Sequence, residues 1–278
     1  MIDIKSALLY GVQLLTHESK ARMDAEILLA FVLKTSRTFL HAHADDVLLD
    51  DDWERYQTLL NKRLQGNPIA YLTGVREFWS LPLTVSKATL IPRHETELLV
   101  ELSLQFLAAQ EESRILDLGT GTGAIALALA SENPLWQIDA VDISIDAINI
   151  AKQNAEHHHL RNVKFYVSNW FSDLPKHKYN IIISNPPYIA VDDPHLKCGD
   201  LRFEPINALI SGRDGLDDLR HLIGQSPDYL SPEGILLVEH GYDQKVNVQS
   251  LFHQAGYHSI QTWKDLQGND RATCGRVK

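Results

Sequence analysis

The sequence has little cysteine, no long apolar run and no excess of positive charge. Its two cysteines, Cys198 and Cys274, form no CxxC pair, so neither a disulfide framework nor a cysteine metal site is expected. No apolar run approaches the roughly 20 residues that span a bilayer. The first residues lack the basic start and apolar core of a signal peptide. These absences favour a cytoplasmic protein without a membrane segment.

The charge balance is acidic, with a net charge of −10 from 26 Lys and Arg against 36 Asp and Glu. Proteins that hold nucleic acid through its phosphates normally carry a basic face, and the sequence has no dense block of Lys and Arg. The balance therefore favours a small-molecule or protein substrate over bulk DNA or RNA. At 278 residues, the chain is long enough for one large domain or two modest ones.

The first part of the chain has a helical pattern, and residues 1–75 are expected to form a helical N-terminal domain. Apolar residues recur there at helical spacing until Gly66 and Pro68 interrupt the pattern. Residues 76–92 indicate a hairpin linker, because Pro82 and Pro92 confine the short extended pieces 78–79, 83–85 and 89–91 to edges. The apolar residues of the helical part are Ala25, Leu28, Leu29, Val32, Trp53, Tyr56, Leu59, Leu60 and Leu64.

From residue 93 to residue 278, strands and helices alternate, which is typical of a parallel, doubly wound α/β sheet. A first helix follows Pro92-Arg93-His94-Glu95. The predicted strands cover residues 114–118, 137–142, 163–167, 180–184, 234–239 and 259–263, and residues 271–277 can add a last one. The predicted helices between them cover residues 124–131, 145–157, 216–223 and 245–255.

A glycine-rich turn, Gly119-Thr120-Gly121-Thr122-Gly123, follows the first of these strands. Glycines there adopt positive φ and let the backbone approach a ligand. The third glycine comes one residue earlier than in the dinucleotide fingerprint G-x-G-x-x-G, and Ala124 holds the expected place. By itself this loop is compatible with a dinucleotide or with S-adenosylmethionine.

Three further side chains are expected beside the glycine loop. Asp142 ends the next strand, where an acidic residue commonly accepts hydrogen bonds from ribose hydroxyls. It can also cap the helix that begins near Ser144. After the third strand, Asn169 can pair with an adenine edge and Trp170 can stack on the ring, although an indole at such a position is more often part of the core.

The stretch Asn185-Pro186-Pro187-Tyr188 directly follows a short apolar strand. The two prolines remove backbone donors and fix φ, so the strand must end there. The Asn185 side-chain oxygen and a proline carbonyl can accept both hydrogens of a planar NH2 group, and Tyr188 can cover its flat face. Open α/β sheets bind ligands at the carboxyl ends of their strands. This position favours a binding site over a turn merely capped by prolines.

The order and spacing of D-L-G-T-G-T-G, the acidic strand end and N-P-P-Y resemble a class I S-adenosylmethionine-dependent methyltransferase. More narrowly, the chain resembles the bacterial release-factor glutamine methyltransferases over essentially its whole length, including Phe78-Trp79-Ser80-Leu81, Ile91-Pro92-Arg93 and Arg202-Phe203-Glu204-Pro205. The resemblance implies a Rossmann-like, mainly parallel, seven-stranded sheet in residues 93–278, a hairpin linker (76–92) and a helical substrate-docking domain (1–75). It also implies methylation of the side-chain nitrogen of the glutamine in the Gly-Gly-Gln loop of class 1 peptide-chain release factors.

The same resemblance implies S-adenosylmethionine as methyl donor, S-adenosylhomocysteine as product, no metal, a monomer, and release factors as partners without membrane or direct nucleic-acid contact. The implied cofactor residues are Gly119, Thr120, Gly121, Thr122 and Gly123 for the methionine part, Asp142 for the ribose, Asn169 and Trp170 for the adenine, and Asn185. The implied catalytic residues Asn185, Pro186, Pro187 and Tyr188 also hold the substrate, with Arg202, Phe203 and Glu204 as a wall over it. The sequence departs from the family pattern at His94, usually proline, and at Asn169, often aspartate.

Two alternatives stay open. An adenine-N6 DNA or RNA methyltransferase also uses N-P-P-Y for a planar NH2 group, but the acidic charge and the lack of an evident base-flipping domain count against it. A non-enzymatic module on a degenerate scaffold is opposed by the intact glycine loop and the intact N-P-P-Y. The stretch Asn185–Tyr188, called the N-P-P-Y corner below, contains no strong base, so any methyl transfer must depend on positioning.

Overall fold

The computed structural model describes residues 2–16 and 20–278. The chain divides into two compact units. One contains Met1–Val75 together with His195–Phe203, and the other contains Arg76–Pro194 and Glu204–Lys278. The segment His195–Phe203 lies far along the chain from the helices it belongs with, and the sequence pattern did not predict this grouping.

The helical unit is built around α2 and α4. Its helices are α1 (Ile4–Leu14), α2 (Ala21–Leu33), α3 (Arg37–Ala42), α4 (Asp50–Leu64) and α5 (Ile69–Thr73). The predicted apolar pattern is confirmed by buried Leu28, Leu29, Tyr56 and Leu60, but Leu64 is 47% exposed because it lies in the last turn of α4. The prediction that Leu64 belongs to the apolar face of this helix was therefore wrong.

Two arginines hold the segment His195–Phe203 within the helical unit. The guanidinium of Arg63 contacts the buried carboxylate of Asp24 at 2.8 Å and that of Asp200 at 3.1 Å. The Nη2 atom of Arg202 donates to the carbonyl of Gln65 over 3.2 Å. The segment carries the short 3-10 helices η2 (Pro194–Lys197) and η3 (Gly199–Phe203).

The second unit begins with a hairpin that is shorter than expected and starts earlier. Its strands are β1 (Val75–Phe78), whose first residue falls in the helical unit, and β2 (Leu81–Thr84). Residues 89–91 form no strand, which corrects that prediction. The two-residue turn is made by Trp79 and Ser80, both with positive φ. Glycine and asparagine usually mark such turns, so Trp79 and Ser80 do not by themselves indicate one.

A seven-stranded sheet forms the centre of the second unit, with strand order β5-β4-β3-β6-β7-β9-β8. The first five strands run parallel, and β9 is antiparallel to both its neighbours. The expected Rossmann-like, mainly parallel sheet is thereby confirmed. The strands are β3 (Arg114–Leu118), β4 (Gln137–Asp142), β5 (Val163–Val167), β6 (Tyr179–Ser184), β7 (Leu230–Glu239), β8 (His258–Lys264) and β9 (Asp270–Arg276).

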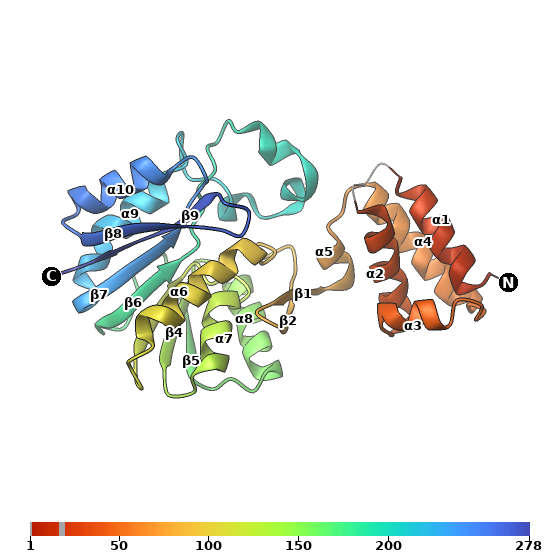
Figure 1. Ribbon diagram of the computed structural model, residues 1–278, viewed down its shortest axis with the longest axis horizontal. Helices are drawn as coiled ribbons and strands as arrows, with labels where there is room; N and C mark the ends of the chain where they lie inside the picture. The colour runs from red at the N-terminus through yellow and green to blue at the C-terminus, as the bar shows by residue number, and fades with distance from the viewer. Residues whose placement is uncertain (1, 17–19) are drawn as a thin grey trace. The chain divides into compact units, whose positions relative to one another are not determined.

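Helices cover both faces of this sheet (Figure 1). Odd and even strand positions point to opposite faces, so Ile115 belongs to the core with α6 and α7, and Leu116 to the core with α9 and α10. The helices are η1 (His94–Thr96), α6 (Glu97–Leu107), α7 (Ala124–Glu132), α8 (Ile145–His157), η4 (Ile206–Ala208), α9 (Asp217–Gln225), η5 (Ser226–Asp228) and α10 (Lys245–Gln254). Within the described residues, no helix is long and apolar enough to cross a membrane.

Candidate active site

A cavity of about 280 Å³ opens at the carboxyl ends of β3 to β6, beside the point where the strand order reverses. Doubly wound sheets bind their ligands at this switch point. Nine of the predicted site residues line the cavity: Gly119, Thr120, Gly121, Thr122, Asp142, Asn169, Trp170, Asn185 and Pro187. Six do not: Gly123, Pro186, Tyr188, Arg202, Phe203 and Glu204.

The glycine loop between β3 and α7 is held in a left-handed backbone conformation. The φ angles of Gly119, Gly121 and Gly123 are +74°, +55° and +84°, which residues with a Cβ adopt at a cost. A Cβ on Gly123 would lie 3.0 Å from the Leu127 side chain, so this glycine allows close packing at the start of α7. A Cβ on Gly121 would meet no atom within 4 Å, which leaves its face of the loop open to a ligand.

Asp117, two residues before this loop, is a buried acidic residue that was not among the predicted site residues. Its Oδ2 atom accepts a hydrogen bond of 2.6 Å from the Thr120 hydroxyl, and this contact ties the glycine loop to the end of β3. Its Oδ1 atom has no hydrogen-bond partner among the described residues. Burial raises the pKa of this carboxyl to about 7. An acidic residue in an otherwise apolar strand was the signal that could have identified it.

Asp142 joins the loop to the next strand. Its Oδ2 atom accepts from the Gly121 N–H at 2.9 Å, and its Oδ1 atom accepts from the Ser144 N–H at 2.9 Å. Burial raises the pKa of the carboxyl. Each carboxylate oxygen can accept more than one hydrogen bond. The contact to Ser144 and the predicted contact to a ribose are therefore compatible.

The side chains after β5 form another wall of the cavity. Trp170 has a φ of +52° and packs against the core while it lines the cavity. Its ring lies 3.4 Å from the position that a Cβ on Gly119 would take, so a larger residue at position 119 would crowd the indole. Asn169 is exposed and lines the same cavity. The structure brings this amide and indole to the glycine loop, and their contact with an adenine remains a prediction.

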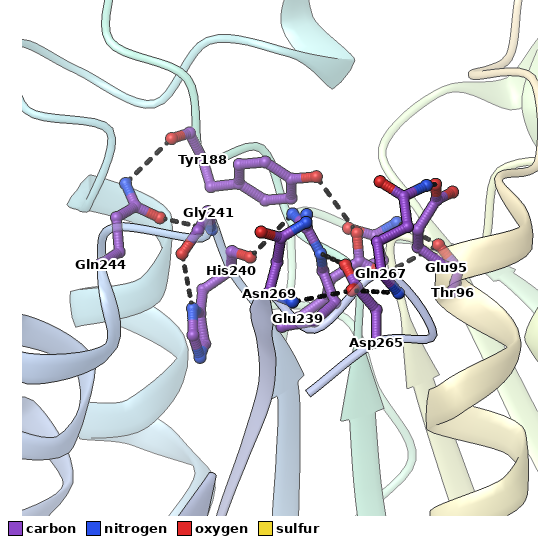
Figure 2. Close-up of polar contacts among 12 residues, drawn as sticks. Glu95, Thr96, Tyr188, Glu239, His240, Gly241, Gln244, Asp265, Gln267 and Asn269 are labelled. Atoms are coloured by element: carbon purple, nitrogen blue, oxygen red, sulfur yellow. Dashed lines mark hydrogen bonds and ion pairs between the residues drawn. The ribbon is translucent and has the colours of Figure 1, made fainter. Parts of the chain in front are cut away.

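The N-P-P-Y corner is connected to a buried carboxylate through side-chain hydrogen bonds. Asn185 Nδ2 donates to the Thr96 hydroxyl over 3.1 Å, and that hydroxyl donates to Glu239 Oε2 over 2.7 Å. From the other side, the Tyr188 phenol donates to Glu239 Oε1 over 3.1 Å (Figure 2). None of the described residues donates a hydrogen bond to the Asn185 Oδ1 atom, which is therefore the acceptor left for a ligand.

The backbone of the corner is held separately. The Gln244 side chain donates from Nε2 to the Tyr188 carbonyl over 3.0 Å and accepts from the Gly241 N–H over 2.8 Å (Figure 2). Thr96, Glu239 and Gln244 were not predicted as site residues from the sequence. Glu239 is the last residue of β7, and the rule that identified Asp142 at the end of β4 would also have found it.

Of the predicted wall residues, Glu204 belongs to the second unit and lies beside the cavity-lining Arg93. Glu204 is buried and pairs with Arg93 at 2.5 Å, and one of its oxygens accepts from the Ile91 N–H at 3.3 Å. The Arg202 guanidinium lies over the Phe203 ring, 4.9 Å from its centroid, and both residues belong to the helical unit. Their contact with a substrate remains a prediction. The described residues contain no group of three or more His, Cys, Asp and Glu that could hold a metal ion.

The sheet order, the glycine loop, the acidic strand end and the proline corner together define a methyltransferase of the Rossmann-like class. Residues 94–199 match the family described as "Methyltransferase small domain". The catalytic domain of hMettl16 has a similar fold, with a TM-score of 0.60 at 15% identity, covering 89% of this chain and 90% of that one.

The particular family follows from the whole chain. Residues 6–74 match the family described as "PrmC N-terminal domain". The release factor glutamine methyltransferase of Salmonella typhimurium is 49% identical over 275 residues, 99% of each chain. That of Escherichia coli is 51% identical over 264 residues, 95% of each chain. The chain therefore belongs to the release factor glutamine methyltransferase family, which confirms the resemblance noted from its motifs.

Proposed function

We propose that this protein methylates the side-chain nitrogen of the glutamine in the Gly-Gly-Gln loop of class 1 peptide-chain release factors, with S-adenosylmethionine as donor. The observation that carries this proposal is the orientation of Asn185. Its Nδ2 atom is engaged by Thr96, so its Oδ1 atom is left to accept from a substrate NH2 group at the cavity. The family membership supports the choice of glutamine and of release factors.

The residues of the cavity fit S-adenosylmethionine. The open face of Gly121 can take the methionine part against the loop, and Asp142 can accept from the ribose hydroxyls. Asn169 and Trp170 offer a hydrogen-bonding edge and a flat face for adenine. When bound, the cofactor supplies an electrophilic methyl group on a positively charged sulfur.

A glutamine amide nitrogen is a weak nucleophile, because its lone pair is delocalised into the carbonyl. In this proposal Asn185 Oδ1 at the cavity accepts one N–H of the substrate amide, and the carbonyl of the next residue, Pro186, which does not itself line the cavity, accepts the other. The nitrogen is thereby held in line with the methyl group. As the N–C bond forms and the C–S bond breaks, these acceptors stabilise the positive charge that develops on the N–H groups. One amide proton is then released, which leaves a neutral methylated glutamine.

The helical unit is proposed as the substrate-docking domain, over residues 1–75. Its compactness and its own family match support a separate role. The hairpin of residues 76–92 is proposed as the linker, and the cytoplasm as the compartment. Because His195–Phe203 belongs to the helical unit, this part of the methyltransferase sequence is expected to take part in the same docking function.

Incubation with methyl-labelled S-adenosylmethionine tests the proposal directly. Release factor, duplex DNA and RNA are offered in parallel. The proposal expects label in the release factor and none in either nucleic acid. Label in DNA or RNA alone would overturn it in favour of adenine-N6 methylation, and label in none of them would favour a non-enzymatic module.

A further inference from the structure

Glu239 is a buried acidic residue behind the candidate active site that lines no part of the cavity. It is 1% exposed, at the carboxyl end of β7. Acidic side chains are almost never fully buried unless they are paired. Here both carboxylate oxygens accept hydrogen bonds, Oε2 from Thr96 and Oε1 from Tyr188. Thr96 contacts Asn185, the first residue of the N-P-P-Y corner, and Tyr188 is the last residue of that corner.

The direction of these hydrogen bonds has a consequence for Asn185. A carboxylate can only accept, so the single proton of the Thr96 hydroxyl is directed to Glu239. The Thr96 oxygen can then only accept from Asn185, which places Nδ2 on that side. If the hydroxyl proton turned toward Asn185 instead, the amide would rotate and present its own NH2 group to the NH2 group of the substrate.

We propose that Glu239 is a positioning residue for methyl transfer. Through Thr96 it directs the oxygen of the Asn185 amide, and not its NH2 group, toward the substrate, and it also anchors the Tyr188 ring. This inference rests on the proposed function, because it assigns a role in holding the glutamine amide. Glu239 touches neither the cavity nor the reacting atoms in this arrangement. Its effect is therefore expected on kcat more than on cofactor affinity.

The charge state of Glu239 matters for the same reason. Burial raises the pKa of its carboxyl to about 7, and the charge of Arg271 on β9 and the hydrogen bonds of Thr96 and Tyr188 oppose that rise. Glu95 on η1 adds to it. A protonated Glu239 carries a donor of its own, which would compete with Thr96 or Tyr188. The orientation of Asn185 should thus weaken as the pH falls through this range.

The test compares Glu239→Gln with a matched pair at Thr96, using the full chain, release factor and S-adenosylmethionine. Glu239→Gln replaces one accepting oxygen by an NH2 donor, so Thr96 or Tyr188 must turn its hydroxyl proton away from position 239. The kcat should then fall about 100-fold, the scale of a misplaced contact group. Thr96→Val removes only the hydroxyl and should lose as much, whereas Thr96→Ser retains the hydroxyl and should keep most of the activity. The double variant Glu239→Gln with Thr96→Val should be little worse than either single one, because both break the same connection.

Two measurements would not change if Glu239 were merely structural: the dependence of kcat on pH, and the exchange of the Asn185 side-chain N–H groups. In the wild type, kcat should decline as the pH falls below about 7, and Thr96→Val should lack that inflection. By ¹⁵N NMR, one Asn185 side-chain N–H should be protected from exchange in the wild type and in Thr96→Ser. It should lose that protection in Thr96→Val and in Glu239→Gln.

The outcomes separate this inference from the proposed function. Wild-type kcat in a folded Glu239→Gln, or in Thr96→Val, would overturn the positioning role while leaving the activity in place. If Glu239→Gln does not fold, the Thr96 pair decides. If the wild type methylates no release factor, the proposed function fails, and the protection of the Asn185 amide across the same variants still supports or overturns the orientation by Glu239.

Discussion

The backbone N–H of Gly121 donates a hydrogen bond of 2.9 Å to the carboxylate of Asp142. This contact ties the middle of the glycine loop to the end of the neighbouring strand β4, and the second oxygen of the same carboxylate holds the Ser144 N–H. The shape of the loop and the proposed ribose contact therefore depend on one side chain.

Replacement of Asp142 by alanine is expected to weaken the binding of S-adenosylhomocysteine. Two backbone donors lose their acceptor, and the ribose loses its proposed partner, at a cost of roughly 1–3 kcal/mol. Calorimetric titration measures the change. Asp146→Ala is the matched control, because Asp146 is an exposed carboxylate in the first turn of the same helix α8. Equal affinities for Asp142→Ala and the wild type would refute the assignment.

The glycine loop, Asp142 and the N-P-P-Y corner could be predicted because each is a local pattern next to a strand end. The connection between Asn185, Thr96 and Glu239 could not, because these residues come from segments separated by 89 and 143 positions. No sequence pattern predicts that the Thr96 hydroxyl in η1 contacts Glu239 at the end of β7. The same limit applies to His195–Phe203, whose place in the helical unit depends on contacts with distant side chains such as Arg63.

Most of the fold was predictable, since the central strands β3, β6 and β7 contain apolar runs and helical spacing marks the segments between the strands. The turn of the hairpin was the exception, because the hairpin was predicted but the position of its turn was not. Trp79 and Ser80 take the positive φ values that the turn requires without a residue that favours them. The surrounding packing compensates, with Phe78 and Leu83 fully buried on either side of the turn.

The buried carboxyl of Asp117 is expected to make the folded state less stable as the pH rises. Burial raises its pKa from 3.8 to about 7, so the folded state holds a proton that the unfolded chain has released. The contribution is fully present below the unfolded value and is lost as the pH rises through about 7. Each pKa unit corresponds to about 1.4 kcal/mol, so the loss is on the order of a few kcal/mol.

Urea unfolding of the wild type and of Asp117→Asn, at several pH values across this range, measures the effect. The asparagine cannot titrate, so the free energy of unfolding of the variant should depend less on pH, and its difference from the wild type should change with pH. Parallel curves for the two proteins would show that Asp117 does not titrate in this range.

Removal of residues 1–75 is expected to separate docking from catalysis. The remaining methyltransferase unit keeps the whole cavity, because every lining residue lies between Phe78 and Asp218. It should bind S-adenosylhomocysteine and methylate a short Gly-Gly-Gln peptide like the full chain, but methylate intact release factor with a much lower kcat/KM. Equal kcat/KM on the intact protein would exclude the docking role.

The most direct test of the account is the turnover of Asn185→Ala on intact release factor, with the methylated residue located by mass spectrometry. Removing one of the two acceptors frees the substrate amide to rotate, and a positioning contact of this kind is worth about 100-fold or more in rate. The account predicts methylation of the Gly-Gly-Gln glutamine by the wild type and none on a release factor carrying asparagine there. It predicts a severe loss of kcat in Asn185→Ala at unchanged affinity for S-adenosylhomocysteine. A kcat within about tenfold of the wild type, in a variant that still binds the cofactor product, would contradict the claim that the N-P-P-Y corner holds the glutamine amide.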